Sequence, residues 1–255
     1  MIEQDSADSA DSADFGFERV RLQEKTRRVG EVFSSVASRY DLMNDLMSLG
    51  IHRAWKRYAI HVAQIKPGAH ILDVAGGTGD MSAMFHQAVG EQGLVIVSDI
   101  NNAMLNEGRD RLLDKGVITG LQYVQANAEA LPFKRNSFDC VCIAFGLRNV
   151  TDKNAALRSM FDKIKYGGSI VILEFSTVVL PFLKQLYETY SFEFIPRLGQ
   201  LIANDKDSYR YLVESISMHP DQDALKDMME AAGFSRVDYY NLTGGIVAVH
   251  KGYKL

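Results

Sequence analysis

The chain has 255 residues, of which 47% are hydrophobic and 24% are charged, and its formal net charge is −4. These values are typical of one globular domain with additions, and the acidic balance argues against a general nucleic-acid binder. The longest apolar runs are strand-sized, and neither a secretory h-region nor an Arg-rich transit peptide occurs. We therefore expect a cytoplasmic protein without a membrane span.

The N-terminal region divides into an acidic tail and a helical segment. Repeated Asp-Ser-Ala triplets without aromatic residues predict a disordered tail over residues 1–14, followed by a single domain over 15–255. Apolar residues recur at helical spacing from Arg19 to Ser48, before the segment Ile51–Gln64. We expect an N-terminal helical cap over 15–66, which packs on the domain and can also close a pocket.

The middle of the chain alternates between strand-like and helix-like segments. Five apolar runs predict strands at Ile71–Val74, Leu94–Ser98, Leu121–Gln125, Phe138–Ala144 and, after Gly167-Gly168, Ser169–Phe175. Helices are expected after Gly79, from an N-cap at Asn101 to Lys115, and from a cap at Thr151 to about Lys165. Strands and helices alternating at this interval predict an α/β fold with a doubly wound, mostly parallel sheet.

The last third departs from this alternation. Val178–Ile202 is rich in aromatic residues but carries charges such as Lys184 and Arg197, which exclude a span. We expect residues 178–216 to form an inserted helical lid over the substrate, with plain core packing as the alternative. A final helix is expected over Asp221–Ala232. The apolar runs Val237–Leu242 and Ile246–Lys251 then predict an antiparallel C-terminal hairpin at the sheet edge.

Cys140 and Cys142 are the only cysteines, and they lie two residues apart in the fourth predicted strand. They point to one face of the sheet and are badly spaced for a disulfide. Because no further Cys and no His cluster occur, we expect two buried reduced thiols and no metal site.

The segment Asp73-Val74-Ala75-Gly76-Gly77-Thr78-Gly79-Asp80 joins the first predicted strand to a helix and is the most informative part of the chain. Its glycines let the backbone approach a ligand closely. Asp99 ends the neighbouring strand, where a carboxylate can accept both ribose hydroxyls. Dinucleotide loops instead have G-x-G-x-x-G spacing and hold a pyrophosphate, which Asp73 and Asp80 would repel. The loop favours S-adenosylmethionine over the alternative of a nicotinamide cofactor.

Two further strand ends carry polar residues where ligands of such sheets bind. Asn127 follows the third strand and can hydrogen-bond an adenine edge, with a backbone N–H beside it for a ring nitrogen; a turn-forming Asn is the alternative. Arg148 and Asn149 follow the fourth strand. We expect them to face the substrate, with surface salt-bridging as the alternative.

From about Phe15 to Leu255 the chain resembles the UbiE/MenG C-methyltransferases of ubiquinone and menaquinone biosynthesis. The segments that carry the resemblance are Tyr40–Trp55, Asp73–Asp80, Asn127–Phe133, Phe145–Asn149, Ala203–Leu212 and Val237–Leu242. The resemblance implies a Rossmann-like methyltransferase with cofactor contacts at Thr78, Asp99, Asn127 and Ala128, beside loop residues Asp73, Gly77 and Gly79. Ala144 stands where the family usually has Ser, which leaves a backbone contact. Lys165-Tyr166-Gly167-Gly168 replaces the usual Lys-Pro-Gly-Gly and changes the turn.

The resemblance also implies methylation of a ring carbon in a polyprenyl quinol, either a methoxy-benzoquinol for ubiquinone or demethylmenaquinol for menaquinone. The ring must be electron-rich, so we expect a quinol substrate and catalysis by alignment and by stabilisation of phenolate charge. Arg148 is expected to stabilise the phenolate and Asn149 to hold a ring oxygen. Candidate bases for the ring proton are His52, Asp207, Tyr209 and His219, or a water held by Arg148.

The isoprenoid tail of such a substrate needs an apolar groove, which the front helices and residues 178–202 can line. Because the tail resides in lipid, we expect peripheral contact with the inner face of the membrane or with a quinone-biosynthesis complex. The oligomeric state stays open, with a homodimer as one option. A methyltransferase for a soluble small molecule and a non-catalytic cofactor-binding scaffold remain as alternative functions.

Overall fold

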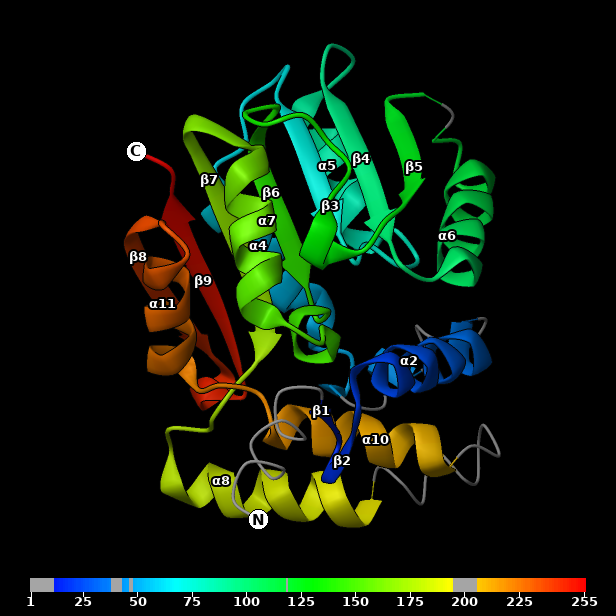
Figure 1. Cartoon of the computed structure of the whole chain (residues 1–255), viewed down its shortest axis with the longest axis vertical. Coiled ribbons are helices and arrows are strands. Elements are labelled where there is room, and N and C mark those ends of the chain that lie inside the picture. Colours follow the sequence, from blue (N-terminus) through cyan, green and yellow to red (C-terminus); the bar gives the residue numbers. More distant parts are fainter. Residues whose placement is uncertain (1–11, 38–42, 46–47, 118, 195–205) are drawn as a thin grey trace, which may run out of the picture.

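The computed structural model describes residues 12–37, 43–45, 48–117, 119–194 and 206–255. Its centre is a seven-stranded sheet with the order β5-β4-β3-β6-β7-β9-β8 (Figure 1). The strands are β3 (His70–Val74), β4 (Leu94–Asp99), β5 (Leu121–Gln125), β6 (Phe138–Ala144), β7 (Ile164–Phe175), β8 (Ser235–Leu242) and β9 (Val247–Tyr253). Neighbours from β5 to β7 are parallel, and β9 is antiparallel to β7 and β8. The predicted sheet and its C-terminal hairpin are confirmed.

Helices cover both faces of the sheet, as expected for strands that are buried on both sides. Helices α4 (His52–Ala63) and α5 (Asp80–Val89) cover one face, and α7 (Lys153–Lys163) and α11 (Gln222–Ala231) cover the other (Figure 1). Helix α6 (Asn102–Asp114) packs against β4 and β5. Cys140 and Cys142 are buried free thiols in the same apolar cluster, and burial raises their pKa values.

The structure places the starts of α7 and β7 at other residues than the sequence predicts. Asp152 caps α7 in place of Thr151, because its carboxylate accepts a hydrogen bond from the Ala155 N–H at 2.9 Å. Strand β7 starts at Ile164, five residues before the predicted start at Ser169, and so contains Gly167-Gly168. The backbone of this extension pairs with Lys254 at the C-terminus. The predicted cap of α6 at Asn101 is confirmed.

The remaining elements lie beyond the carboxyl ends of the parallel strands (Figure 1). They are the hairpin β1 (Ser12–Phe15) and β2 (Glu18–Arg21) and the helices α2 (Leu22–Val36), α8 (Pro181–Thr189) and α10 (Lys206–Ser217). Residues 12–14 of the predicted disordered tail therefore form a strand, and the predicted helix from Arg19 begins only at Leu22. The Phe15 ring stacks on Tyr211 with centroids 4.2 Å apart, which anchors the hairpin on α10.

Parts of the predicted tail, cap and lid, namely residues 1–11, 38–42, 46–47 and 195–205, lie outside the described residues. Within the described ranges, no helix combines the length and the hydropathy that a bilayer crossing requires. The same ranges contain no group of three or more His, Cys, Asp or Glu side chains placed to hold a metal ion.

Candidate active site

A cavity, called here the strand-end cavity, opens at the carboxyl ends of β3, β4, β5 and β6. The loops after these strands form its walls, and helix α2 covers it. The lining residues are Thr26, Val29, Gly30, Phe33, Val74, Ala75, Gly77, Asp99, Ile100, Asn101, Met104, Ala126, Asn127, Ala128, Glu129, Phe145, Gly146, Asn149, Val150 and Thr151. Of the predicted site residues, this set contains Gly77, Asp99, Asn127, Ala128 and Asn149.

Asp99 ends β4 with a carboxylate whose orientation is fixed. Its Oδ2 accepts a hydrogen bond from the Gly77 N–H at 3.0 Å, and its Oδ1 accepts one from the Asn101 N–H at 2.8 Å. Burial raises the pKa of Asp99 to about 6, against the opposing effect of these N–H donors. The carboxylate is thus ionised at neutral pH and can accept further hydrogen bonds from ligand hydroxyls.

The loop after β3 packs closely against α6. Gly79 has a φ of +80°, and a Cβ at this position would lie 2.6 Å from Leu112 Cδ1. On the facing helix, a Cβ at Gly108 would lie 2.5 Å from the carbonyl oxygen of Gly77. Both positions therefore require glycine. The role of Gly108 was not predicted, because its partner in the loop is 31 residues away in the chain.

The two carboxylates that flank the loop, Asp73 and Asp80, do not have the predicted role of attracting a cationic ligand. Asp73 is buried, accepts a hydrogen bond from Ser82 Oγ at 2.5 Å, and has a pKa raised to about 7 by burial. Asp80 forms ion pairs with Lys56 at 2.8 Å and with Arg111 at 2.7 Å. Burial alone would raise the pKa of Asp80, but these cations lower it. Neither side chain lines the cavity, so neither presents a free charge to a cationic ligand there.

Thr78, Gly79 and Ala144, three predicted cofactor contacts, also do not line the strand-end cavity. Thr78 is buried, as is Gly79 against α6. Ala144 is half-buried and pairs with Leu173 of β7 as the last residue of β6. Their roles as cofactor contacts stay predictions from the resemblance.

The loop after β5 places polar atoms at the opposite wall. Asn127 caps the short 3-10 turn Ala128–Ala130, because its Oδ1 accepts from the Glu129 N–H at 3.0 Å. The turn-forming alternative is thus correct for Oδ1, while Nδ2 remains as a donor. Glu129, which was not predicted, accepts from the N–H groups of Thr151 and Asp152 at 3.1 and 3.0 Å. It ties this loop to the loop after β6.

Helix α2 is fastened over the cavity at both sides. Asn101 Nδ2 donates to Gly30 O at 3.0 Å and to Ser34 Oγ at 2.9 Å. On the other side, Lys25 Nζ donates to Val150 O at 3.2 Å. Helix α2 therefore covers the cavity, and Asn101 serves both as helix cap and as tether. The tether has no signal in the sequence, because it depends on how α2 lies across the sheet.

Arg148 lies behind the cavity wall. Its Nη1 donates to Glu174 Oε1 at 2.7 Å and to Phe145 O at 2.6 Å, and both ionic side chains are only 2% exposed. The guanidinium also lies over the Phe175 ring, 5.4 Å from its centroid. Arg148 therefore forms a buried ion pair, so both the prediction that it faces the substrate and the alternative of a surface salt bridge are wrong. The buried pair fixes the turn Phe145–Asn149, and Phe145 adopts a positive φ of 55° there.

Asn149 does face the cavity, as predicted. Its Oδ1 accepts a hydrogen bond from Tyr211 Oη at 3.0 Å. The amide orientation is thereby set, and Nδ2 is left as the group that can donate to a ligand. Tyr211 comes from α10, more than sixty residues later in the chain, so the sequence alone does not indicate this pair.

His52 has the arrangement of a general base, although it does not line the strand-end cavity. Its Nε2 lies 2.9 Å from Asp45 Oδ1, and its buried Nδ1 has no hydrogen-bond partner among the described residues. Burial lowers the pKa of His52, against the raising effect of Asp45. The imidazole is therefore neutral at pH 7 and able to accept a proton.

The other three candidate bases do not line the strand-end cavity either. His219 is buried behind Arg148 and Lys153, and burial first, then these cations, holds its pKa well below the ordinary value. Tyr209 is fully buried on α10, and Asp207 is exposed at the start of that helix.

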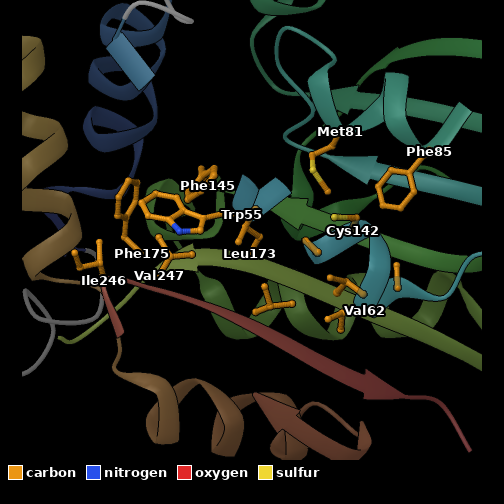
Figure 2. Packing of buried hydrophobic residues seen from close by; sticks show 14 of the residues in the cluster. Trp55, Val62, Met81, Phe85, Cys142, Phe145, Leu173, Phe175, Ile246 and Val247 are labelled. Atoms are coloured by element: carbon orange, nitrogen blue, oxygen red, sulfur yellow. The ribbon is translucent and has the colours of Figure 1, made fainter. Parts of the chain in front are cut away.

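Aromatic side chains gather next to the cavity at the carboxyl ends of β6 and β7 (Figure 2). Phe145 lines the cavity and lies 5.0 Å from Phe175 and 6.4 Å from Trp55, measured between ring centroids. Trp55 Nε1 donates to Thr243 Oγ1 at 2.8 Å, which fixes the indole. All three rings are buried, and of the three it is Phe145 that gives the cavity wall an aromatic face.

The strand-end cavity fits S-adenosylmethionine better than a dinucleotide. Its charged lining residues are the carboxylates Asp99 and Glu129, and this described lining contains no Lys or Arg. A pyrophosphate would find no cation there, whereas a sulfonium and an ammonium are stabilised by nearby carboxylates. The predicted acidic character is therefore present, but it comes from Glu129 and Asp99 and not from Asp73 and Asp80.

Solved structures share the fold at low sequence identity. An S-adenosylmethionine-dependent methyltransferase of Thermotoga maritima, described as a possible histamine N-methyltransferase, matches with a TM-score of 0.62 at 17% identity, over 89% of this chain and 100% of that chain. Phosphoethanolamine N-methyltransferase 2 of Haemonchus contortus, solved with S-adenosylmethionine, matches with a TM-score of 0.57 at 13% identity, over 78% of this chain and 52% of that chain.

Sequence relatives are much closer. The ubiquinone/menaquinone biosynthesis C-methyltransferase UbiE of Vibrio cholerae is 59% identical over 254 residues, which cover 100% of this chain and 98% of the relative. The protein of the same name from Salmonella paratyphi B is 58% identical over 247 residues, covering 97% and 98%. The model of the ubiE/COQ5 methyltransferase family matches residues 21–254. The cavity, the fold and these relatives agree, and the chain belongs to the ubiE/COQ5 methyltransferase family.

Proposed function

We propose that this chain transfers a methyl group from S-adenosylmethionine to a ring carbon of a polyprenyl quinol in ubiquinone or menaquinone biosynthesis. The observation that carries the cofactor assignment is the oriented Asp99 carboxylate in a cavity whose described lining has no Lys or Arg. The acceptor assignment is supported by the names of relatives that are 57–59% identical over nearly the whole chain.

The residues of the cavity have separate tasks in this proposal. Bound S-adenosylmethionine supplies an electrophilic methyl group on a cationic sulfur. Asp99 would accept the ribose hydroxyls, and the Nδ2 of Asn127 would donate to an adenine ring nitrogen. Helix α2 covers the cavity and would exclude water from the reacting groups.

The acceptor ring would lie against the aromatic cluster, of which Phe145 forms part of the cavity wall. Asn149 Nδ2 would donate to a ring oxygen and stabilise the negative charge of the phenolate form. An oxidised quinone lacks the electron density that a ring carbon needs to attack the methyl group, so the quinol is the reactive form. Arg148 would act by holding the Phe145–Asn149 turn.

His52 is the base that we propose for the ring proton. It is neutral and paired with Asp45, and it precedes Trp55 of the aromatic cluster by one helical turn on α4. Residues three apart lie on the same side of a helix, so His52 shares the face of α4 that carries Trp55.

Access to a lipid-borne acceptor would come from peripheral membrane contact at the inner face. Exposed apolar side chains near the start of α8 support this, with Phe182 at 76% and Val179 at 53% exposure. Replacing Phe182 with Ser is expected to weaken binding to anionic vesicles in a flotation assay. Equal flotation of both proteins would contradict a role for this segment.

The function is tested by transfer of labelled methyl to a short-tailed methoxy-benzoquinol and to demethylmenaquinol, each supplied reduced and oxidised. We expect label only in reduced acceptors. Absence of label while the cofactor is bound would contradict catalysis and favour a cofactor-binding scaffold. Equal labelling of a quinol without a prenyl tail would favour a soluble small molecule as the acceptor.

A further inference from the structure

A second cavity, called here the hairpin cavity, lies beside the strand-end cavity and has no role in the proposed reaction. It is enclosed by the β1–β2 hairpin, α2, the start of α7 and the end of α10. Thr26, Glu129 and Thr151 line both cavities and form the wall between them. The hairpin cavity therefore adjoins the proposed cofactor site without being part of it.

Two ammonium groups, those of Lys25 and Lys153, line this cavity, and neither forms an ion pair with a described residue. Lys25 is only 3% exposed, and its one described hydrogen bond goes to the neutral Val150 carbonyl. The half-buried Lys153 side chain makes no hydrogen bond or ion pair within the described ranges, and burial lowers its pKa. Burial and the nearby charge of Lys153 together lower the pKa of Lys25 to about 8. A buried ammonium without an anionic partner is costly, so Lys25, with a second ammonium on the wall of the same cavity, requires an explanation.

The carboxylates around the cavity are engaged elsewhere. Glu174 pairs with Arg148, and Asp152 accepts from the first turn of α7. Glu129 accepts the two backbone N–H groups at the start of that helix. Asp14 lies 3.6 Å from Arg19 at the exposed rim. These acids lower the local potential, but none forms an ion pair with either lysine.

We propose that the hairpin cavity is a binding site for a phosphate-type dianion, held between Lys25 and Lys153. A dianion would neutralise both ammonium groups, and each lysine has donors left for its oxygens. A monovalent carboxylate would neutralise only one of the two and should bind more weakly. The shared chemistry is the phosphate group, whether as the free ion or on a larger molecule.

An anion bound in the hairpin cavity would connect helices α2 and α7. Lys25 belongs to α2, which covers the strand-end cavity, and Lys153 begins α7. An anion between them would hold α2 closed, so phosphate and S-adenosylmethionine should strengthen each other's binding. Asp14, Glu129 and Lys153 are the charged groups that act on Lys25, and its ammonium form, which the site needs, is lost as the pH rises through about 8.

The test is titration calorimetry of the full chain with inorganic phosphate near neutral pH, at constant ionic strength set with chloride. We expect saturable binding that weakens at least about tenfold in Lys153→Met and in Lys25→Met. Lys134→Met, an exposed lysine that lines neither cavity, should bind as the unchanged chain does. Acetate should bind about tenfold more weakly than phosphate.

Lys153→Met decides the outcome if Lys25→Met disturbs α2, and its fold is checked by cofactor affinity without phosphate. Absence of saturable phosphate binding, or equal binding by Lys153→Met and the unchanged chain, would overturn the proposal, and equal affinity for acetate would overturn the preference for a dianion. Glycerol phosphate is compared in the same way. Tighter binding of the ester identifies a phosphorylated molecule as the ligand, and tighter binding of the inorganic ion identifies free phosphate.

Discussion

At the scale of single residues, three aspartates near the glycine loop have three different environments. Asp73 is buried beside Ser82 with a pKa of about 7, and Asp80 is neutralised by Lys56 and Arg111. Asp99 alone reaches the strand-end cavity. All three have the same residue type, so the sequence indicates an acidic loop but not which carboxylate a ligand meets.

Asp99→Ala is expected to weaken S-adenosylmethionine binding by about 1–3 kcal/mol, or about 5–150-fold, through lost ribose hydrogen bonds. Calorimetry of cofactor binding measures this. Asp110→Ala, whose side chain is 68% exposed, is the matched control and should leave the affinity unchanged. The pKa of about 6 adds a second expectation, since affinity should fall as the pH drops through 6 and the acceptor becomes protonated. Unchanged affinity in Asp99→Ala would refute the assignment.

The Arg148–Glu174 pair predicts a stability effect. Arg148→Met leaves a buried carboxylate without its cation and should lower the free energy of unfolding by about 3–5 kcal/mol. Adding Glu174→Gln should recover much of that loss, because the unpaired charge is removed. Arg135→Met is the control, since its ion pair with Asp162 is exposed and should contribute less than about 1 kcal/mol. Equal urea unfolding curves for Arg148→Met and Arg135→Met would argue against a positioning role.

His52→Gln should abolish most of the turnover and remove the acidic limb of the pH–rate profile. The histidine must be neutral to accept a proton, and burial lowers its pKa below the ordinary 6.5, so turnover of the unchanged chain should fall only below that pH. Saturating cofactor separates this limb from the titration of Asp99. A variant that keeps both the turnover and the acidic limb would exclude His52 as the base.

At the scale of elements, α2 acts as the cover of the strand-end cavity, and Asn101 connects it to the sheet. Asn101→Asp keeps the acceptor that caps α6 but loses the Nδ2 donors to Gly30 and Ser34. We expect dissociation of S-adenosylmethionine to become about tenfold faster, measured by stopped-flow displacement. Asn102→Asp, an exposed neighbour, is the control. Identical dissociation rates in the two variants would show that the tether does not hold the cover.

The strands were predictable because each is a short apolar run bounded by turn residues, and their alternation with helices fixed the parallel sheet. The β1–β2 hairpin was not predictable, because the short polar sequence of Glu18–Arg21 resembles the first turn of the helix that follows it. Among the predicted site residues, Asp99 at the end of β4 and Asn127 and Asn149 in the loops after β5 and β6 line the cavity. The burial of Arg148 against Glu174 could not be predicted, because Glu174 comes from the neighbouring strand β7, 26 residues away.

At the scale of the whole molecule, the parallel strands present the residues of the strand-end cavity at their carboxyl ends, and the N-terminal elements together with α8 and α10 lie beyond those ends (Figure 1). Distant parts of the chain meet there: Lys25 and Gly30 of α2 and Tyr211 of α10 hydrogen-bond to residues of the strand-end loops. The acidic cavity therefore lies between the sheet and its cover, and the aromatic cluster adjoins it at Phe145.

The most direct test of the account locates the transferred methyl group. The full chain is incubated with S-adenosylmethionine carrying a deuterated methyl group and a short-tailed quinol, and the product is analysed by deuterium NMR and mass spectrometry. The account predicts a deuterated methyl group on a ring carbon, formed only from the reduced acceptor. A deuterated methoxy group, or product formed equally from the oxidised quinone, would contradict it.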